Sequence, residues 1–280
     1  MRIADIFKEK RPISFEIFPP KGELSMDSFR QTLDALAKLS PDFISVTCSA
    51  GGSGGRDRTA ALAGIVRREF GIESCAHLTC INSDQATLTE DINRIHENGV
   101  ENVLALRGDI IPGAHTGTFH HAVELMDKLK GEGLCLGGAC YPEGHIECSD
   151  PQEDLRHLYE KQQAGAEFFV TQLFFDNACF YKFMDRARQI GITIPVTAGI
   201  MPILSKAQIE RMIFTCGASL PSAIIRILNR YENDAESLRK AGIDYAAAQI
   251  RDLRQNGADG VHIYTMNRPG IATEILKGMQ

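Results

Sequence analysis

The feature that most constrains the fold is a regular alternation, along the whole chain, between short apolar runs and longer amphipathic segments. Eight runs have the length and composition of β-strands: Ile13–Phe18, Phe43–Thr47, Glu73–Thr79, Asn102–Leu106, Leu134–Tyr141, Glu167–Phe174, Ile194–Ala198 and Gly260–Tyr264. Apolar residues recur at helical spacing in the segments between them: Met26–Leu39, Thr59–Phe70, Thr87–Asn98, His120–Lys130, Pro151–Ala164, Ala178–Ile190 and Lys206–Thr215. Strand followed by helix, repeated, is typical of an α/β protein with a parallel sheet. Eight such units predict closure into a (β/α)8 TIM barrel.

Signals at the predicted helix ends agree with this arrangement. The strings NGVEN and AGAEF each end a helix at a glycine, just before the next strand. The string SDPQEDL opens another helix with a cap and with proline in its first turn. Two further helices, over Pro221–Asn233 and Ala235–Asn256, form an extra excursion before the eighth strand. Since such a barrel needs about 250 residues, we expect residues 1–280 to form one catalytic domain.

Composition argues against several classes of protein. The formal net charge is −6 and no long run of Lys or Arg occurs, so nothing favours nucleic acid or an anionic membrane as a partner. The sequence shows neither a signal peptide nor an apolar stretch of about 20 residues, and we expect a cytoplasmic protein. The eight cysteines include no CxxC pair, which argues against a zinc or iron–sulfur site held by this chain alone.

The ends of the predicted strands carry polar side chains, and barrels of this type place their active sites there. These residues are Glu16, Thr47, His77, Arg107, Asp109, Tyr141, Gln172 and Arg268. Each has an ordinary explanation when it is taken alone: Glu16 as an ion-pair partner, His77 as a satisfied core histidine, and the GGSGG segment as a flexible loop. The joint pattern is harder to dismiss, because a buried acid is costly unless it is paired or used.

A metal site is the first alternative to an organic cofactor. Possible ligands are His77, Asp109, Glu143 and His145. The chain contains no HxH or HExxH string, and the strand ends mix acids with amides and arginine instead of clustering imidazoles. We therefore expect no catalytic metal.

Taken together, the motifs resemble those of the methylenetetrahydrofolate reductase family, flavin-dependent barrel enzymes of one-carbon metabolism. The matching strings are SFEIFPPK, FISVTCSAGGSGGRDRT, AHLTC, VLALRGD, YPEGH, DLRHLYEKQQAGAEFFVTQLFFD, GIMPI and HIYTMNR. They follow one another in order from the first strand to Arg268 and so cover nearly the whole chain. The resemblance implies that FAD binds in the barrel mouth. It also implies a ping-pong scheme, in which NAD(P)H delivers a hydride and leaves before methylenetetrahydrofolate takes it.

The resemblance also implies roles for individual residues. Glu16 is the general acid, because the folate ring opens to an iminium only when its departing nitrogen receives a proton. Asp109 is the second catalytic residue, whose negative charge would stabilise that cation. Gln172 and Arg268 bind the folate together with these two acids. The cofactor-binding positions are Thr47, His77, Arg107, Gly108, Asp109, Ala139, Tyr141, Asp154, His157 and Lys161.

Some residues depart from the family pattern. Cys48 and Met212 stand where aromatic residues are common, and His157 and Glu160 stand where an amide and a basic residue are expected. These departures leave the electron donor open between NADH, NADPH and an iron–sulfur partner protein.

Other hypotheses remain beside the reductase. A proline-dehydrogenase-like flavin barrel should lack the acid of the FEIFPP string, and a flavin- or folate-binding protein without turnover would have no need of it. We also expect a homo-oligomer, as in many members of the family, and no second, regulatory domain.

Overall fold

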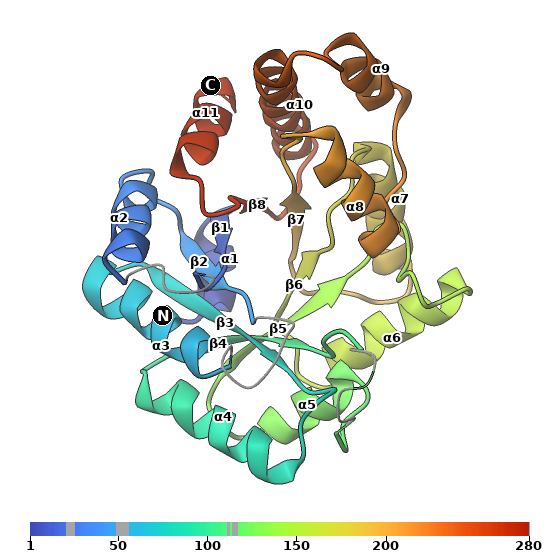
Figure 1. Cartoon of the computed structure of the whole chain (residues 1–280). Helices are drawn as coiled ribbons and strands as arrows, with labels where there is room; N and C mark the ends of the chain where they lie inside the picture. Colours follow the sequence, from blue (N-terminus) through green and yellow to red (C-terminus); the bar gives the residue numbers. More distant parts are fainter. Residues whose placement is uncertain (21–25, 49–55, 111–112, 114–116, 280) are drawn as a thin grey trace.

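The computed structural model describes residues 1–20, 26–48, 56–110, 113 and 117–279. Its strands are β1 (Ile13–Ile17), β2 (Phe43–Val46), β3 (Glu73–Thr79), β4 (Asn102–Leu106), β5 (Cys135–Cys140), β6 (Phe168–Thr171), β7 (Val196–Ile200) and β8 (Gly260–Tyr264). Neighbouring strands pair in parallel in chain order, and β1 also pairs with β8, so the sheet closes into a barrel (Figure 1). The predicted (β/α)8 fold is confirmed.

Helices surround the barrel on its outer side (Figure 1). They are α2 (Met26–Ala37), α3 (Arg56–Phe70), α4 (Gln85–Glu97), α5 (Ala122–Leu129), α6 (Pro151–Gln163), α7 (Asn177–Gln189), α8 (Lys206–Cys216), α9 (Ser222–Arg230), α10 (Ala235–Gln255) and α11 (Pro269–Met279). The predicted excursion before the last strand is therefore confirmed as α9 and α10. The predicted cap of α6 is also present, since the Asp150 side chain accepts a hydrogen bond from Gln152 N–H.

One element was not predicted from the sequence. The helix α1 (Ile3–Glu9) packs Ile3 and Ile6 against apolar side chains contributed by five strands. Those side chains are Phe43, Cys75, Leu104, Cys135, Phe168 and Val170. They come from β2 to β6, so α1 covers apolar side chains of the barrel interior.

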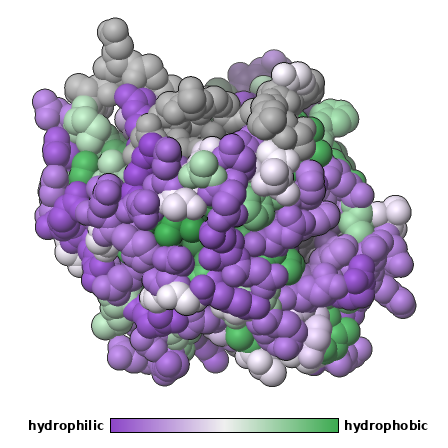
Figure 2. Space-filling model, turned by 90° about the horizontal axis from the view of Figure 1, so that it is seen from below, coloured by the Kyte–Doolittle hydropathy of each residue, from purple (hydrophilic) through white to green (hydrophobic). Residues whose placement is uncertain are grey.

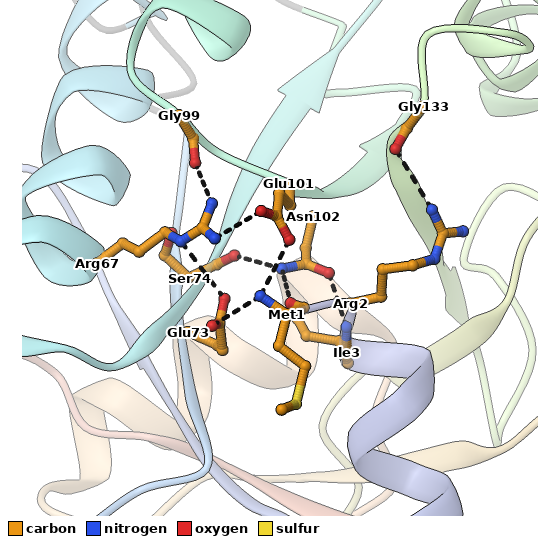
Figure 3. A network of polar contacts seen from close by, with 10 residues as sticks. All are labelled: Met1, Arg2, Ile3, Arg67, Glu73, Ser74, Gly99, Glu101, Asn102 and Gly133. Carbon is orange, nitrogen blue, oxygen red and sulfur yellow. Dashed lines mark hydrogen bonds and ion pairs between the residues drawn. The ribbon is translucent and has the colours of Figure 1, made fainter.

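Polar contacts fix α1 to the strands (Figure 3). The Asn102 side chain is fully buried; its Oδ1 accepts from Ile3 N–H over 2.7 Å, and its Nδ2 donates to the carbonyls of Met1 and Ser74. Arg67 donates to Glu101 over 2.5 Å on the rim of the same network. A buried amide with all these partners is costly to remove, because the groups it serves would lose their hydrogen bonds.

The surface shown in Figure 2 is mainly hydrophilic, and apolar residues occur on it only in small groups. All eight cysteines are free thiols. Within the described residues, no helix combines the length and the apolar character needed to span a bilayer.

Candidate active site

A layer of polar side chains lies inside the barrel, next to the apolar cluster that α1 covers. Ser14 and Glu16 are two positions apart on β1 and so share one face of the strand. Glu16 is in register with Ser45 on β2 and with Tyr264 on β8. Ser14 and Ser45 are buried, whereas the Glu16 side chain keeps 20% of its surface exposed. The acid is thus set in the wall of the barrel, with access to solvent from one side.

Two imidazoles flank the Glu16 carboxylate. Its Oε2 lies 3.7 Å from Nε2 of His77 on β3 and 3.6 Å from Nε2 of His262 on β8. Burial lowers the pKa of His77 to about 4, against the opposing effect of the Glu16 charge, so this ring is neutral near pH 7. The buried Nε2 of His77 has no hydrogen-bond partner among the described residues.

His262 is held more firmly than His77. Its Nδ1 lies 2.7 Å from the Ser14 hydroxyl, and its Nε2 lies 3.1 Å from the Ser45 hydroxyl. Its ring stacks on Phe43 with centroids 5.9 Å apart and meets the ring of Tyr264 edge-on. This residue was not predicted from the sequence, although polar side chains at His262 and Tyr264, two positions apart on β8, indicate a polar interior.

A second group of polar side chains joins β5 to α6. Lys161 donates from Nζ to the Ala139 carbonyl over 2.8 Å and lies 5.6 Å from the centre of the Tyr141 ring. Burial lowers the pKa of Lys161, and nearby Asp154 opposes this effect. Burial also raises the pKa of both Tyr141 and Asp154. These four predicted cofactor residues are brought together by the fold.

The loop after β4 presents Arg107, Gly108 and Asp109. Arg107 forms a two-point ion pair with Glu147, at 2.5 and 3.1 Å, and this partner raises its pKa. Gly108 has a φ of +89°, and a Cβ there would lie 2.9 Å from Thr79 Cβ. The Asp109 side chain is exposed, and its charge adds to the rise in the pKa of Tyr141. Arg107 and Asp109 are therefore close enough to the β5–α6 group to act on it electrostatically.

The remaining predicted residues lie at strand ends or near them. Gln172 follows β6, and its Oε1 accepts from Leu173 N–H over 2.9 Å. The carbonyl of Thr47, after β2, accepts from the Thr59 hydroxyl. Arg268 is exposed just before α11. His157 lies on α6, where its Nδ1 is 3.1 Å from Glu160 Oε2, so two of the residues that depart from the family pattern contact each other.

Two expectations concern residues at the edge of the described chain. The GGSGG segment lies outside the described residues. Cys48, which precedes it, accepts a weak hydrogen bond from the Thr79 hydroxyl at 3.9 Å.

Met212 packs against the apolar cluster under α8. Among the described residues, no group of three or more His, Cys, Asp or Glu is placed to hold a metal ion.

The residues around the β5–α6 group fit FAD, the cofactor that the motifs imply. Lys161 is a cation in a partly buried setting, and Arg107 is a second cation whose partner Glu147 is half exposed. An anionic diphosphate would be a suitable partner for both. The missing side chain at Gly108 lets the main chain of this turn approach Thr79 closely, beside the β5–α6 group.

The chain is similar to known proteins along almost its whole length. The family described as "Methylenetetrahydrofolate reductase" matches residues 2–280. The "5,10-methylenetetrahydrofolate reductase" of Pectobacterium carotovorum subsp. carotovorum is 32% identical over 264 residues, which is 94% of this chain and 88% of that protein. The "Methylenetetrahydrofolate reductase 1" of Schizosaccharomyces pombe is 32% identical over 269 residues, covering 93% of this chain and 44% of that protein. The chain therefore spans about half the length of the fungal and plant relatives it matches.

A solved structure has the same fold. It is titled "Uncharacterized protein from Clostridium thermocellum binds two copies of 5-methyl-5,6,7,8-tetrahydrofolic acid". It superposes with a TM-score of 0.67 at 13% identity, covering 100% of this chain and 98% of that one.

Proposed function

Because this chain belongs to the methylenetetrahydrofolate reductase family, we propose that it reduces 5,10-methylenetetrahydrofolate to 5-methyltetrahydrofolate, with FAD as cofactor and NAD(P)H as electron donor. The observation that carries the proposal is the position of Glu16, a partly exposed acid inside the barrel wall with two imidazoles on one of its oxygens. Relatives named as NADH enzymes, such as that of Arabidopsis thaliana, support NADH as the donor.

Glu16 supplies the proton that the reaction needs. The methylene carbon bridges two nitrogens, and hydride attack requires that one carbon–nitrogen bond break to leave an iminium. The proton goes from Glu16 Oε to the departing nitrogen, and the bonding electrons go to that same nitrogen. When bound, FAD supplies the hydride chemistry between the nicotinamide and the folate. The exposed carboxylate of Asp109 then provides negative charge for the cationic carbon.

Gln172 is suited to orient the folate. Its Oε1 is engaged by Leu173 N–H, which fixes the plane of the amide. Its NH2 group has no hydrogen-bond partner among the described residues, so it is available to donate to the pterin edge. Arg268, exposed near the end of β8, is a cation for the carboxylates of the folate tail.

The other cofactor contacts follow from the fold. Lys161 and Arg107 would hold the diphosphate of FAD, while Ala139, Tyr141, Asp154 and His157 line the adjoining part of β5 and α6. Thr47, His77 and the turn at Gly108 would contact the flavin ring. These assignments are proposals that rest on the charge, the burial and the location of each side chain.

The test is the visible spectrum of the FAD-loaded protein under anaerobic conditions. NADH, or NADPH in a parallel sample, should bleach the flavin absorbance, and 5,10-methylenetetrahydrofolate should then restore it. If neither nicotinamide bleaches the flavin, but dithionite reduces it and the folate then reoxidises it, the electron donor would be a protein and not a nicotinamide. A reduced flavin that the folate leaves reduced would overturn the proposed reaction.

A further inference from the structure

Tyr264 is a polar residue of the barrel interior to which the reaction described above gives no role. It lies on β8, in register with Glu16 of β1. Its hydroxyl donates to the Thr171 carbonyl at the end of β6 over 2.9 Å. In the closed sheet β7 lies between β6 and β8, so this hydrogen bond passes over a whole strand. Burial raises the pKa of Tyr264 well above its ordinary value, so the hydroxyl keeps its proton and remains a donor.

Gly199 on β7 leaves space for this hydrogen bond. A Cβ atom at position 199 would lie 2.4 Å from the Thr171 carbonyl oxygen and 2.6 Å from the Tyr264 hydroxyl oxygen. Both distances are far shorter than a van der Waals contact, so any side chain here would displace the tyrosine or the carbonyl. The tyrosine hydroxyl thus occupies the space that a side chain of β7 would fill.

The Thr171 carbonyl can accept from Tyr264 because the pairing of β6 with β7 ends just before it. The last residues in register are Val170 and Thr197. In a regular parallel pair, the next hydrogen bond would run from Gly199 N–H to the Thr171 carbonyl. Gly199 N–H donates to the Thr171 hydroxyl oxygen over 2.8 Å. The hydroxyl of Thr171 thereby takes the place of its own carbonyl and leaves that carbonyl to the tyrosine.

Thr171 is followed directly by Gln172, the residue proposed to orient the folate. The Thr171 carbonyl and the Gln172 N–H belong to one peptide group, which is planar and rigid. Its oxygen accepts from Tyr264, and its nitrogen donates to the Cys140 carbonyl on β5 over 2.8 Å. The side chain of Gln172 therefore leaves a main chain that is held on both sides, and its Oε1 is held in turn by Leu173 N–H.

We propose that Tyr264 is a positioning residue for Gln172, which it holds, through the Thr171 carbonyl, in the orientation that binds the pterin edge of the folate. Tyr264 is paired with Glu16 in the sheet, so one side chain links the strand of the proton donor to the residue that orients the substrate. This inference rests on the proposed function for the identity of the ligand, whereas the hold on Gln172 is a property of the protein alone.

The first test does not depend on activity. In 15N NMR, the side-chain NH2 signals of Gln172, identified by their absence in Gln172→Glu, should shift in Tyr264→Phe, which removes only the hydroxyl. Tyr245→Phe is the matched control, because the Tyr245 hydroxyl on α10 donates to the Phe175 carbonyl, also beyond β6, over 2.6 Å. Its loss should leave the Gln172 signals in place. Identical Gln172 signals in wild type and Tyr264→Phe would overturn the inference.

The second test measures the binding of tetrahydrofolate to the FAD-loaded protein by calorimetry in the absence of oxygen. Tetrahydrofolate presents the pterin edge but carries no one-carbon unit, so it is bound without being turned over. We expect Tyr264→Phe to weaken its binding by about 5- to 10-fold, the effect of one lost hydrogen bond, and Tyr245→Phe to change it by less than about twofold. The amount of bound FAD, measured by absorbance, should be the same in both variants. Equal affinity in wild type and Tyr264→Phe would contradict the positioning role.

A double-mutant cycle tests whether Tyr264 acts through Gln172. In the Gln172→Ala background, Tyr264→Phe should weaken tetrahydrofolate binding no further. The same loss in both backgrounds would refute the positioning role, because Tyr264 would then act on the folate independently of Gln172.

Thr171 provides a second variant in case Tyr264→Phe does not fold. Thr171→Val frees Gly199 N–H to take the Thr171 carbonyl from Tyr264, so it should also weaken tetrahydrofolate binding. Thr171→Ser keeps the hydroxyl and should bind like the wild type, and equal affinity of the two Thr171 variants would count against the inference. A wild type that binds no tetrahydrofolate would refute the proposed function, and the NMR comparison would still decide the hold on Gln172.

Discussion

The Asn267 side chain forms two hydrogen bonds with the main chain of Phe18, where β1 and β8 pair to close the barrel. Its Nδ2 donates to the Phe18 carbonyl over 2.8 Å, and its Oδ1 accepts from Phe18 N–H over 3.0 Å. The residue itself has a φ of +53°, in the left-handed region that asparagine tolerates better than most residues. One side chain thereby joins the residue that follows β1 to the turn that follows β8. Glu16 lies near the end of β1, and His262 lies on β8.

Removing these two hydrogen bonds should destabilise the protein. We expect Asn267→Ala to lower the free energy of unfolding by about 2–3 kcal/mol, through two lost hydrogen bonds and the cost of a left-handed alanine. Asn267→Gly loses the same hydrogen bonds without that backbone cost, so its loss should be smaller by about 1 kcal/mol. Urea unfolding measures both, and equal stability of wild type and Asn267→Ala would contradict the role.

Glu16→Gln should separate the two half-reactions. The amide keeps the shape of the side chain but cannot donate the required proton, so folate reduction should fall by about 10²–10⁴-fold. Flavin reduction by the donor should change little, as measured by stopped-flow absorbance. Glu167→Gln, at the opposite end of the barrel, where Glu167 pairs with Arg2, is the matched control and should keep both rates.

Gly108 should tolerate no side chain. We expect Gly108→Ala to cost about 2–4 kcal/mol, because an alanine at this φ is strained and its Cβ would also press on Thr79. Gly131 has a similar φ of +87° with no atom within 4 Å of the added Cβ, so Gly131→Ala should cost about 1 kcal/mol. Thermal unfolding compares the two, and equal losses would mean that the contact with Thr79 is unimportant.

His77 should make stability depend on pH. Its pKa is about 4 in the folded protein and about 6.5 when unfolded, so the unfolded state binds more protons between these values. The neutral His77 therefore contributes fully to the free energy of unfolding above about pH 6.5. This free energy falls as the pH falls towards 4, by at most about 2 kcal/mol between pH 7.5 and 5. Urea unfolding at the two pH values should show this loss in wild type and in His96→Asn, and its absence in His77→Asn.

Lys161 should link FAD binding to pH. Since burial lowers its pKa, the side chain loses its charge at a lower pH than an ordinary lysine, and its attraction for the diphosphate is lost with it. FAD affinity, measured by flavin fluorescence, should therefore weaken as pH rises into the alkaline range. Lys161→Met should weaken binding by about 10- to 100-fold and remove this dependence. Lys161→Arg, which stays charged, should bind at every pH.

The barrel was predictable because it depends on local patterns. Strand and helix periods identified all eight units. The ends of the predicted strands singled out Glu16 and Gln172 as candidates, whereas Gly108 and the roles of all three residues came from the family resemblance and stay predictions. The short helix α1 was missed because seven residues with two buried isoleucines give almost no periodicity, and the side chain of its N-cap residue, Arg2, makes no capping hydrogen bond.

His262 was missed for a different reason. It lies in the middle of an apolar run, and only the pairing of β1 with β8 brings it to Glu16. The pair of Arg107 and Glu147 likewise joins residues 40 positions apart, in two loops whose approach no local pattern reveals.

The pairing of β1 with β8 has a consequence for how the chain folds during its synthesis. Ser14 and His262 touch although 248 positions separate them, so the ribosome makes the first strand long before its last partner. Until that partner emerges, a nascent chain carries Glu16 on an open sheet edge, with no imidazole from β8 beside it. Contacts this distant in sequence form slowly. His262 can therefore contact Glu16 only after β8 has been made, and a chain that stalls short of β8 holds the carboxylate without that imidazole.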